Sequence, residues 1–184
     1  MRIKVCGMTK PEQVYQLNEW GVEFAGFIFY PKSPRYVTPE VAKELGAGLD
    51  IWKVGVFQDE LPSVIENTVR DAQLDIAQIY GGDLPDVTRI WRAFRPQSAA
   101  RPDESVEAIL LDGPANGIAF DWKQARGISE KVILAGGLNA SNVAEAIRIA
   151  QPWGVDASSG LESSPGIKDH DKVREFVKAA RQAA

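Results

Sequence analysis

The sequence contains very few residues of the types that form disulfides or metal sites. Its 184 residues include one cysteine and one histidine. A single cysteine cannot form an internal disulfide, which is typical of proteins kept in a reducing cytoplasm. The histidine, His170, has no second His or Cys at metal-ligand spacing, so we expect it to be a surface residue. The sequence therefore predicts a cytoplasmic protein without a metal site.

The sequence also has fewer basic than acidic residues. The 21 Lys and Arg residues are outnumbered by 25 Asp and Glu residues, and the formal net charge is -4. This balance argues against nucleic acid or an anionic membrane as a partner. The first residues, Met1–Lys4, do not form a signal peptide, and no apolar run approaches the length that spans a bilayer. We expect any anionic ligand to be held locally, by backbone N–H groups and a few cations.

Apolar, β-branched runs alternate with segments of helical spacing along the chain. Eight runs predict strands: Ile3–Cys6, Phe24–Phe29, Trp52–Phe57, Ile76–Ile79, Ile90–Phe94, Ala108–Leu111, Lys131–Ala135 and Gly154–Ala157. Strands that alternate with helices indicate a parallel sheet. Eight such units in one chain predict a single-domain (β/α)8 TIM barrel over residues 1–184 rather than an open sheet.

Three of the connections between these strands are short. A crossover with its helix needs about 10–12 residues, and Tyr80–Arg89 barely meets that length and contains glycines and a proline. Pro96–Glu107 is also short, and the sixth helix can be little more than Trp122–Arg126. We therefore expect the helices after strands four and five, and also the one after strand six, to be shortened or missing.

Glycine-rich segments follow the last two predicted strands. Gly136 and Gly137 follow the seventh strand, and Ser159 and Gly160 follow the eighth. Either pair alone could form nothing more than a tight turn. In (β/α)8 barrels, however, these two loops commonly bind phosphate, because glycine lets the backbone approach the oxygens and free N–H groups favour the anion. Together the two pairs predict a phosphate-binding site.

Ionisable side chains end three of the predicted strands. Cys6 ends the first, Asp112 ends the sixth and Asp156 lies in the eighth, so all three belong to the barrel face that carries active sites. Cys6 could also be a small buried hydrophobe, and either aspartate could cap the loop that follows it. Arg35 lies in a loop with two prolines after the second strand, and taken alone it would be a solvated surface charge. Position makes these four residues candidates for the site.

Six segments resemble motifs of the phosphoribosylanthranilate isomerases of tryptophan biosynthesis. They are Val5–Thr9, Gly26–Val37, Val54–Phe57, Phe120–Trp122, Leu134–Asn142 and Gly154–Lys168. The resemblance implies a (β/α)8 barrel and a cofactor-free Amadori rearrangement. In this reaction N-(5′-phosphoribosyl)anthranilate, an aminoaldose, becomes 1-(o-carboxyphenylamino)-1-deoxyribulose 5-phosphate, the corresponding aminoketose.

The resemblance also implies a role for each candidate residue. Asp112 would be the general acid that opens the furanose ring, and Cys6 would be the general base that takes the proton from C2′. These roles require a raised pKa for Asp112 and a lowered pKa for Cys6. Arg35 would hold the anthranilate end or favour the developing charge, and Asp156 would position the sugar. The phosphate would be bound by Gly136, Gly137, Ser159 and Gly160.

Two features depart from the family pattern. Tyr80 stands where the family usually has a histidine, and the loop after Asp112 is shorter and lacks the usual lysine. Two other functions therefore stay open: the related phosphosugar isomerisation of histidine biosynthesis, and a phosphate-binding barrel without catalysis. The histidine-pathway relative uses a carboxylate as its base, so Cys6 argues against the first. Reduced helical cover would suit a monomer or a weak homodimer.

Overall fold

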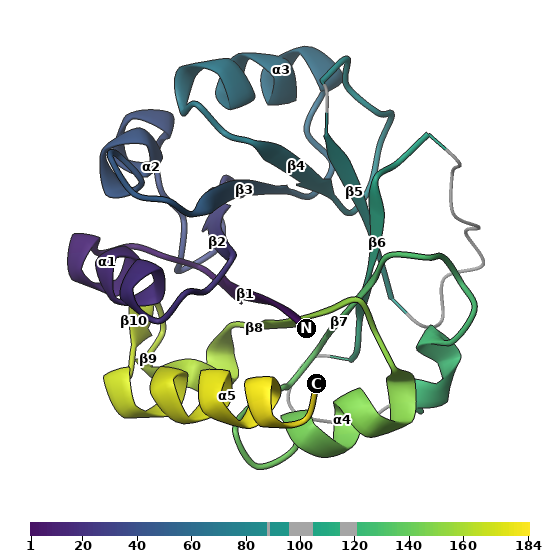
Figure 1. Cartoon of the computed structure of the whole chain (residues 1–184). Helices are drawn as coiled ribbons and strands as arrows, with labels where there is room; N and C mark the ends of the chain where they lie inside the picture. Colours follow the sequence, from purple (N-terminus) through teal and green to yellow (C-terminus); the bar gives the residue numbers. More distant parts are fainter. Residues whose placement is uncertain (88, 96–104, 115–120) are drawn as a thin grey trace.

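Eight parallel strands close into a barrel in chain order, from β1 to β8 (Figure 1). The structure is a computed structural model that describes residues 1–87, 89–95, 105–114 and 121–184. The strands are β1 (Arg2–Cys6), β2 (Phe24–Ile28), β3 (Trp52–Phe57), β4 (Ile76–Ile79), β5 (Ile90–Phe94), β6 (Ala108–Asp112), β7 (Val132–Ala135) and β8 (Gly154–Ala157). The predicted (β/α)8 barrel is confirmed, and no predicted strand end is wrong by more than one residue.

The strands read as nearly continuous apolar runs because both of their faces are buried. Inside the barrel, Trp91 is fully buried and meets the ring of Phe24 edge to face at 4.8 Å between centroids. Outside the barrel, alternate residues such as Phe27 and Phe57 belong to the cluster between strands and helices. The barrel interior is therefore a packed core beneath its mouth.

Within the described residues, five α-helices surround the strands. They are α1 (Pro11–Glu19), α2 (Pro39–Leu45), α3 (Pro62–Asp71), α4 (Val143–Ala150) and α5 (His170–Gln182). Each of the first three begins with proline, which lacks the N–H that would be unpaired at a helix start. The hydroxyl of Thr38 accepts a hydrogen bond from the Val41 amide and caps α2. No helix in the described ranges is long and apolar enough to cross a membrane.

Helical cover is reduced along one side of the barrel. No helix joins β4 to β5 in the described part of that connection, and the described part of the β6–β7 connection contains one 3-10 turn, η1 (Trp122–Ala125). The missing fourth helix and the shortened sixth helix are thus confirmed. The prediction for the fifth helix falls mainly on residues 96–104, which lie outside the described residues.

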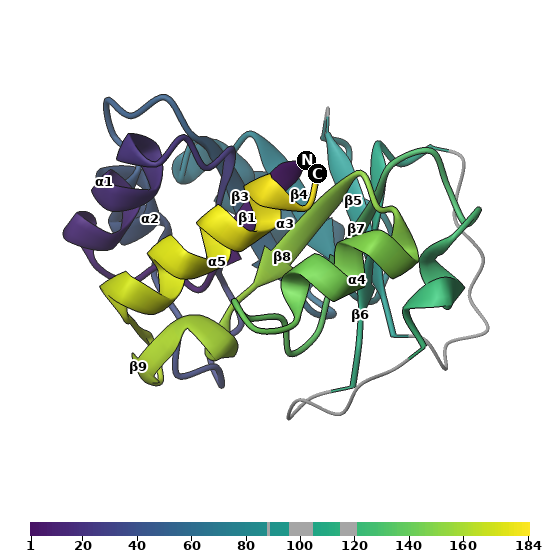
Figure 2. The same cartoon turned by 60° about the horizontal axis from the view of Figure 1, so that its bottom comes forward.

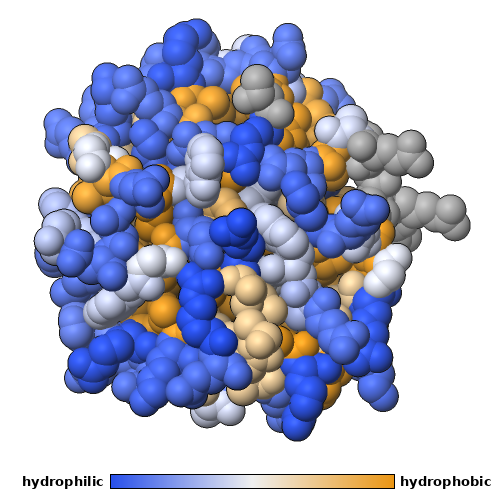
Figure 3. Space-filling view, in the orientation of Figure 1, coloured by the Kyte–Doolittle hydropathy of each residue, from blue (hydrophilic) through white to orange (hydrophobic). Residues whose placement is uncertain are grey.

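A small antiparallel hairpin follows β8 and was not predicted. It consists of β9 (Glu162–Ser164) and β10 (Ile167–Lys168) and comes after a 3-10 turn, η2 (Ser159–Leu161). Figure 2 shows β9 at the barrel end opposite the two termini, which lie close together. The hairpin is therefore placed beside the active-site end of the barrel. Polar side chains cover most of the opposite face, which carries the termini (Figure 3).

Candidate active site

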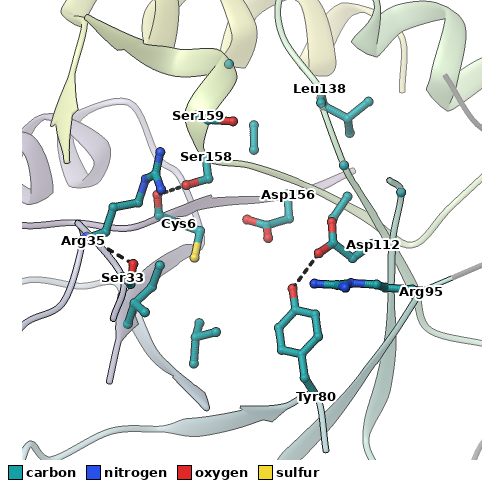
Figure 4. Close-up of a pocket in the computed structure, with 18 of the residues that line it drawn as sticks. Cys6, Ser33, Arg35, Tyr80, Arg95, Asp112, Leu138, Asp156, Ser158 and Ser159 are labelled. Carbon is teal, nitrogen blue, oxygen red and sulfur yellow. Dashed lines mark hydrogen bonds between the residues drawn. The ribbon is translucent and has the colours of Figure 1, made fainter. Parts of the chain in front are cut away.

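A cavity of about 440 Å³ opens at the C-terminal ends of the strands (Figure 4). Its walls include every residue that the sequence predicted for the site: Cys6, Arg35, Asp112, Gly136, Gly137, Asp156, Ser159 and Gly160. Residues on the inward face of each strand meet there because the strands are parallel and their C-terminal ends share one face. The structure thus brings all eight candidates into one site.

Cys6 occupies the wall formed by β1 and β2. Its side chain is buried, and the Ser158 hydroxyl donates a 3.0 Å hydrogen bond to its carbonyl oxygen. Gly26 is the register partner of Cys6, and a Cβ added there would lie 2.8 Å from Sγ. Only glycine at that position leaves space for the thiol.

Lys4 lies on the same inward face of β1 as Cys6 and was missed from the sequence. Its side chain is 1% exposed, and Nζ is 3.0 Å from Oδ2 of Asp156. Burial disfavours the charged amine and is the largest single effect, but Asp156 and Cys6 together outweigh it and raise the pKa of Lys4. The other carboxylate oxygen, Oδ1, is buried and has no hydrogen-bond partner among the described residues. A lysine two residues before Cys6 in a buried strand was the available signal.

Breaking the Lys4–Asp156 pair by removing one partner is expected to destabilise the fold. Replacing Lys4 with methionine leaves a buried carboxylate without its cation, so we expect the free energy of unfolding to fall by about 3 kcal/mol. Urea denaturation of the wild type and the variant measures this change. The double variant Lys4→Met with Asp156→Leu should recover much of the loss. A single-variant loss below about 1 kcal/mol would contradict a buried charged pair.

The pKa of Cys6 is raised, which corrects the expectation of a lowered value. Burial penalises the thiolate most, whereas the charge of Lys4 acts in the opposite direction. The negative charge of Asp156 also disfavours the thiolate and partly cancels the effect of Lys4. The protein therefore holds Cys6 mainly as a thiol near neutral pH.

Asp112 has the raised pKa that a general acid requires. Burial is the main cause, and it outweighs the hydrogen bond from Tyr80 and the charges of Arg95 and Lys4, which all lower the pKa. The Tyr80 hydroxyl donates to Oδ2 of Asp112 at 2.9 Å (Figure 4). Tyr80, at the position where the resemblance implies a histidine, thus places a hydrogen-bond donor on the acid.

Arg35 reaches the cavity but is paired with Glu162 on the hairpin. Its Nε and Nη2 donate to the two carboxylate oxygens of Glu162 at 2.7 and 2.6 Å. Lys168 donates to the same carboxylate at 2.7 Å. Burial alone would raise the pKa of Glu162, but these two cations lower it. Neither Glu162 nor Lys168 was predicted, because their role depends on a hairpin that returns to a loop far earlier in the chain.

The glycine loops after β7 and β8 approach other backbone segments closely. Gly136 has a φ of +94°, and a Cβ there would collide with the backbone of Gly113. Within the described residues, the amides of Gly136 and Gly137 donate no backbone hydrogen bond. Such free N–H groups beside a cavity suit an oxyanion.

His170 lies outside the cavity. It is exposed at the start of α5, and its ring meets Trp20 edge to face at 4.9 Å. In the described part of the chain no group of three His, Cys, Asp or Glu side chains could hold a metal ion. The prediction of a surface histidine is confirmed.

The sequence and the structure both match known proteins. Residues 3–179 match the family model for N-(5′-phosphoribosyl)anthranilate isomerase. The chain is 45% identical to an enzyme of that name from Solibacter usitatus, over all of this chain and 98% of the relative. The solved phosphoribosyl anthranilate isomerase from Thermus thermophilus is 31% identical, with a TM-score of 0.89 and full coverage of both chains.

A second solved structure carries a ligand. It is a phosphoribosyl anthranilate isomerase in complex with reduced 1-(o-carboxyphenylamino)-1-deoxyribulose 5-phosphate, 33% identical, with a TM-score of 0.84 and 99% coverage of both chains. The likeness in sequence and in fold therefore extends over nearly the whole chain. The chain belongs to the N-(5′-phosphoribosyl)anthranilate isomerase family.

Proposed function

We propose that this protein isomerises N-(5′-phosphoribosyl)anthranilate to 1-(o-carboxyphenylamino)-1-deoxyribulose 5-phosphate in tryptophan biosynthesis. The observation that carries the proposal is a single cavity with a half-buried carboxyl, Asp112, and a buried thiol, Cys6, on either side of Asp156 (Figure 4). Membership of the isomerase family supports the same reaction. A general acid on one wall of the cavity and a general base on the other suit an aldose–ketose isomerisation.

The first step needs an acid. Asp112 gives its proton to the furanose ring oxygen, the bond from that oxygen to C1′ breaks, and the nitrogen lone pair forms the Schiff base. The carboxylate left on Asp112 is then stabilised by the Tyr80 hydroxyl and by the charge of Arg95. Burial favours the protonated acid before the step, and these neighbours favour its anion afterwards.

The second step needs a base. The Cys6 thiolate takes the proton from C2′, and the electron pair moves into the Schiff base to give an enolamine, which tautomerises to the ketone. Lys4 and Lys168 place positive charge near the thiolate. In this assignment Asp156 positions the sugar, the four glycine-loop residues bind the phosphate, and Arg35 favours the developing charge beside Cys6.

An activity assay tests the proposal. Purified protein is mixed with freshly generated phosphoribosylanthranilate, and the loss of anthranilate-type fluorescence is followed. The aminoaldose of histidine biosynthesis serves as the comparison substrate. Turnover of the first substrate only is expected. Absence of turnover above the background rate would refute the proposed activity. A preference for the second substrate would assign the protein to the isomerisation of histidine biosynthesis.

We expect kcat/KM to depend on pH as a bell. The active form has Asp112 protonated and Cys6 ionised, so the pair shares one proton. Because the pKa of Cys6 is raised, that proton is more often on Cys6, and the active form is the minor one. The rate therefore rises as pH passes the pKa of Asp112 and falls as it passes that of Cys6. The Tyr80→Phe variant loses a hydrogen bond that lowers the pKa of Asp112, so its acidic limb should move upward. An unmoved limb, or one that moves downward, would contradict this assignment.

We also propose that the protein acts in the cytoplasm, as a monomer or a weak homodimer with a small-molecule substrate. The single cysteine and the acidic net charge support this setting. Light scattering over a range of concentrations measures the mass. A concentration-independent mass above that of a dimer would refute the proposed state.

A further inference from the structure

Glu162 holds an arginine of the cavity wall from behind. Its two carboxylate oxygens accept hydrogen bonds from Nε and Nη2 of Arg35 at 2.7 and 2.6 Å, so they occupy one edge of the guanidinium. Glu162 does not line the cavity, whereas Arg35 does and its side chain is 19% exposed. Within the described residues, no hydrogen bond involves the third nitrogen, Nη1. Arg35 therefore keeps one donor nitrogen for a ligand while its other edge is fixed.

The path of the Arg35 side chain to the cavity is narrow. A Cβ added to Gly7 would lie 2.6 Å from Cδ of Arg35, so the side chain passes directly over the residue that follows Cys6 (Figure 4). This contact places the aliphatic part and keeps the charge of Arg35 near Cys6. It does not set the rotation of the planar guanidinium, which depends on the bidentate partner. The orientation of the guanidinium is thus set by Glu162.

Lys168 prevents the pairing from cancelling the charge of Arg35. Its Nζ lies 2.7 Å from Oε1 of Glu162, its side chain is 3% exposed, and it also donates to the carbonyl oxygen of Ser158 at 3.2 Å. Burial lowers the pKa of Lys168, but the contact with Glu162 favours its charged form. Because two cations share one carboxylate, the cluster keeps one net positive charge beside the cavity.

We propose that Glu162 is a positioning residue that orients Arg35 towards the anthranilate carboxylate, and this inference rests on the proposed function. The substrate carries two anionic groups, a phosphate on C5′ and a carboxylate on the ring that is joined through nitrogen to C1′. Backbone N–H groups of the glycine loops suit the phosphate, so the carboxylate needs a cation of the cavity wall. Nη1 of Arg35 supplies that cation, and the edge held by Glu162 sets its direction.

The charge of Glu162 and its positioning role predict opposite effects on binding. Because the substrate is anionic, loss of a nearby negative charge would by Coulomb attraction alone strengthen binding. If Glu162 positions Arg35, its loss leaves Arg35 and Lys168 to repel each other and lets the guanidinium rotate. Binding of the ring carboxylate then weakens. The sign of the change therefore separates the two effects.

Calorimetry tests the proposal with two ligands. They are reduced 1-(o-carboxyphenylamino)-1-deoxyribulose 5-phosphate and the same compound without the ring carboxyl. We expect the wild type to prefer the first by about 10- to 100-fold, the scale of a charge-assisted hydrogen bond. Arg35→Gln should abolish this preference and Glu162→Gln should abolish most of it, with the Kd of the second ligand unchanged in both. Glu162→Asp, which keeps the charge but withdraws the carboxylate by one methylene, should also lower the preference.

Glu107 provides a matched control at the other end of the barrel. Its carboxylate accepts hydrogen bonds from Nε and Nη2 of Arg89 at 2.7 and 3.0 Å and forms an ion pair with Lys131 at 3.7 Å. Glu107→Gln therefore breaks a cluster of the same composition and should keep the full preference. Thermal unfolding of both variants measures the structural loss that they have in common.

A double variant shows whether Glu162 acts through Arg35. Arg35→Gln with Glu162→Gln should lose no more preference than Arg35→Gln alone. An unchanged or increased preference in Glu162→Gln would overturn the proposal, as would an equal loss of affinity for both ligands, which a purely structural role predicts. If the wild type turns over the substrate but Arg35→Gln keeps the preference, this inference fails alone. If the wild type neither binds nor turns over, the proposed function fails as well.

Discussion

Replacing Asp112 with asparagine is expected to lower kcat by about 10²–10⁴-fold, the usual scale of lost general acid catalysis. The asparagine keeps an oxygen that can accept the hydrogen bond now donated by Tyr80 at 2.9 Å, so the local geometry should persist. It has no proton to give to the ring oxygen. Ring opening should therefore become rate-limiting, and steady-state kinetics with the natural substrate measures the loss.

The control for this variant removes a carboxylate elsewhere. Asp171 lies at the exposed start of α5, so Asp171→Asn should leave kcat unchanged. Thermal unfolding of both variants checks that the fold is retained. An Asp112→Asn enzyme with near-native kcat would show that another group opens the ring, and the acid would have to be sought elsewhere in the cavity.

Replacing Cys6 with serine is expected to cause a loss of similar size, about 10²–10⁴-fold in kcat. Serine is close to cysteine in size and keeps the packing against Gly26, but its hydroxyl is far too weak an acid to supply an anion near neutral pH. The C2′ proton then has no base. If thiolate basicity is what matters, Cys6→Ala should lose as much activity as Cys6→Ser.

The titration of Cys6 can be followed directly. Because the chain has one cysteine, ultraviolet absorbance of the thiolate reports this residue alone. Burial should place its pKa above the ordinary value for a thiol, and the Lys4→Met variant should raise it further, since the charge of Lys4 favours the thiolate. A Cys6→Ser enzyme with near-native kcat, or a thiol that ionises below its ordinary range, would contradict this account.

The lowered pKa expected for Cys6 was the main error of the sequence-based reasoning. The expectation came from the role of general base, which the family resemblance implies for Cys6 and which requires a thiolate. The structure adds two facts that act against it: near-complete burial, and Asp156 beside Lys4. Both depend on how β1 pairs with β8, since the Lys4–Asp156 contact joins residues 152 positions apart.

Sequence alone determined the barrel and the location of its site. The alternation of apolar runs and helical segments predicts parallel strands, and parallel strands bring their C-terminal ends to one face. For that reason Cys6, Asp112 and the glycine loops could be placed in one cavity before any contact was known. Local propensity and chain order are enough for these predictions, because the predictions concern only where a residue lies along its strand.

Only the tertiary structure decided which side chains meet and how they are charged. Closure of the barrel brings Tyr80 to Asp112, and the hairpin after β8 carries Glu162 to Arg35, 127 residues away. These partners were invisible in the sequence because no spacing rule connects them. Hydrogen-bond partners and burial, which set pKa values and free donors, arise from long-range packing and not from local pattern.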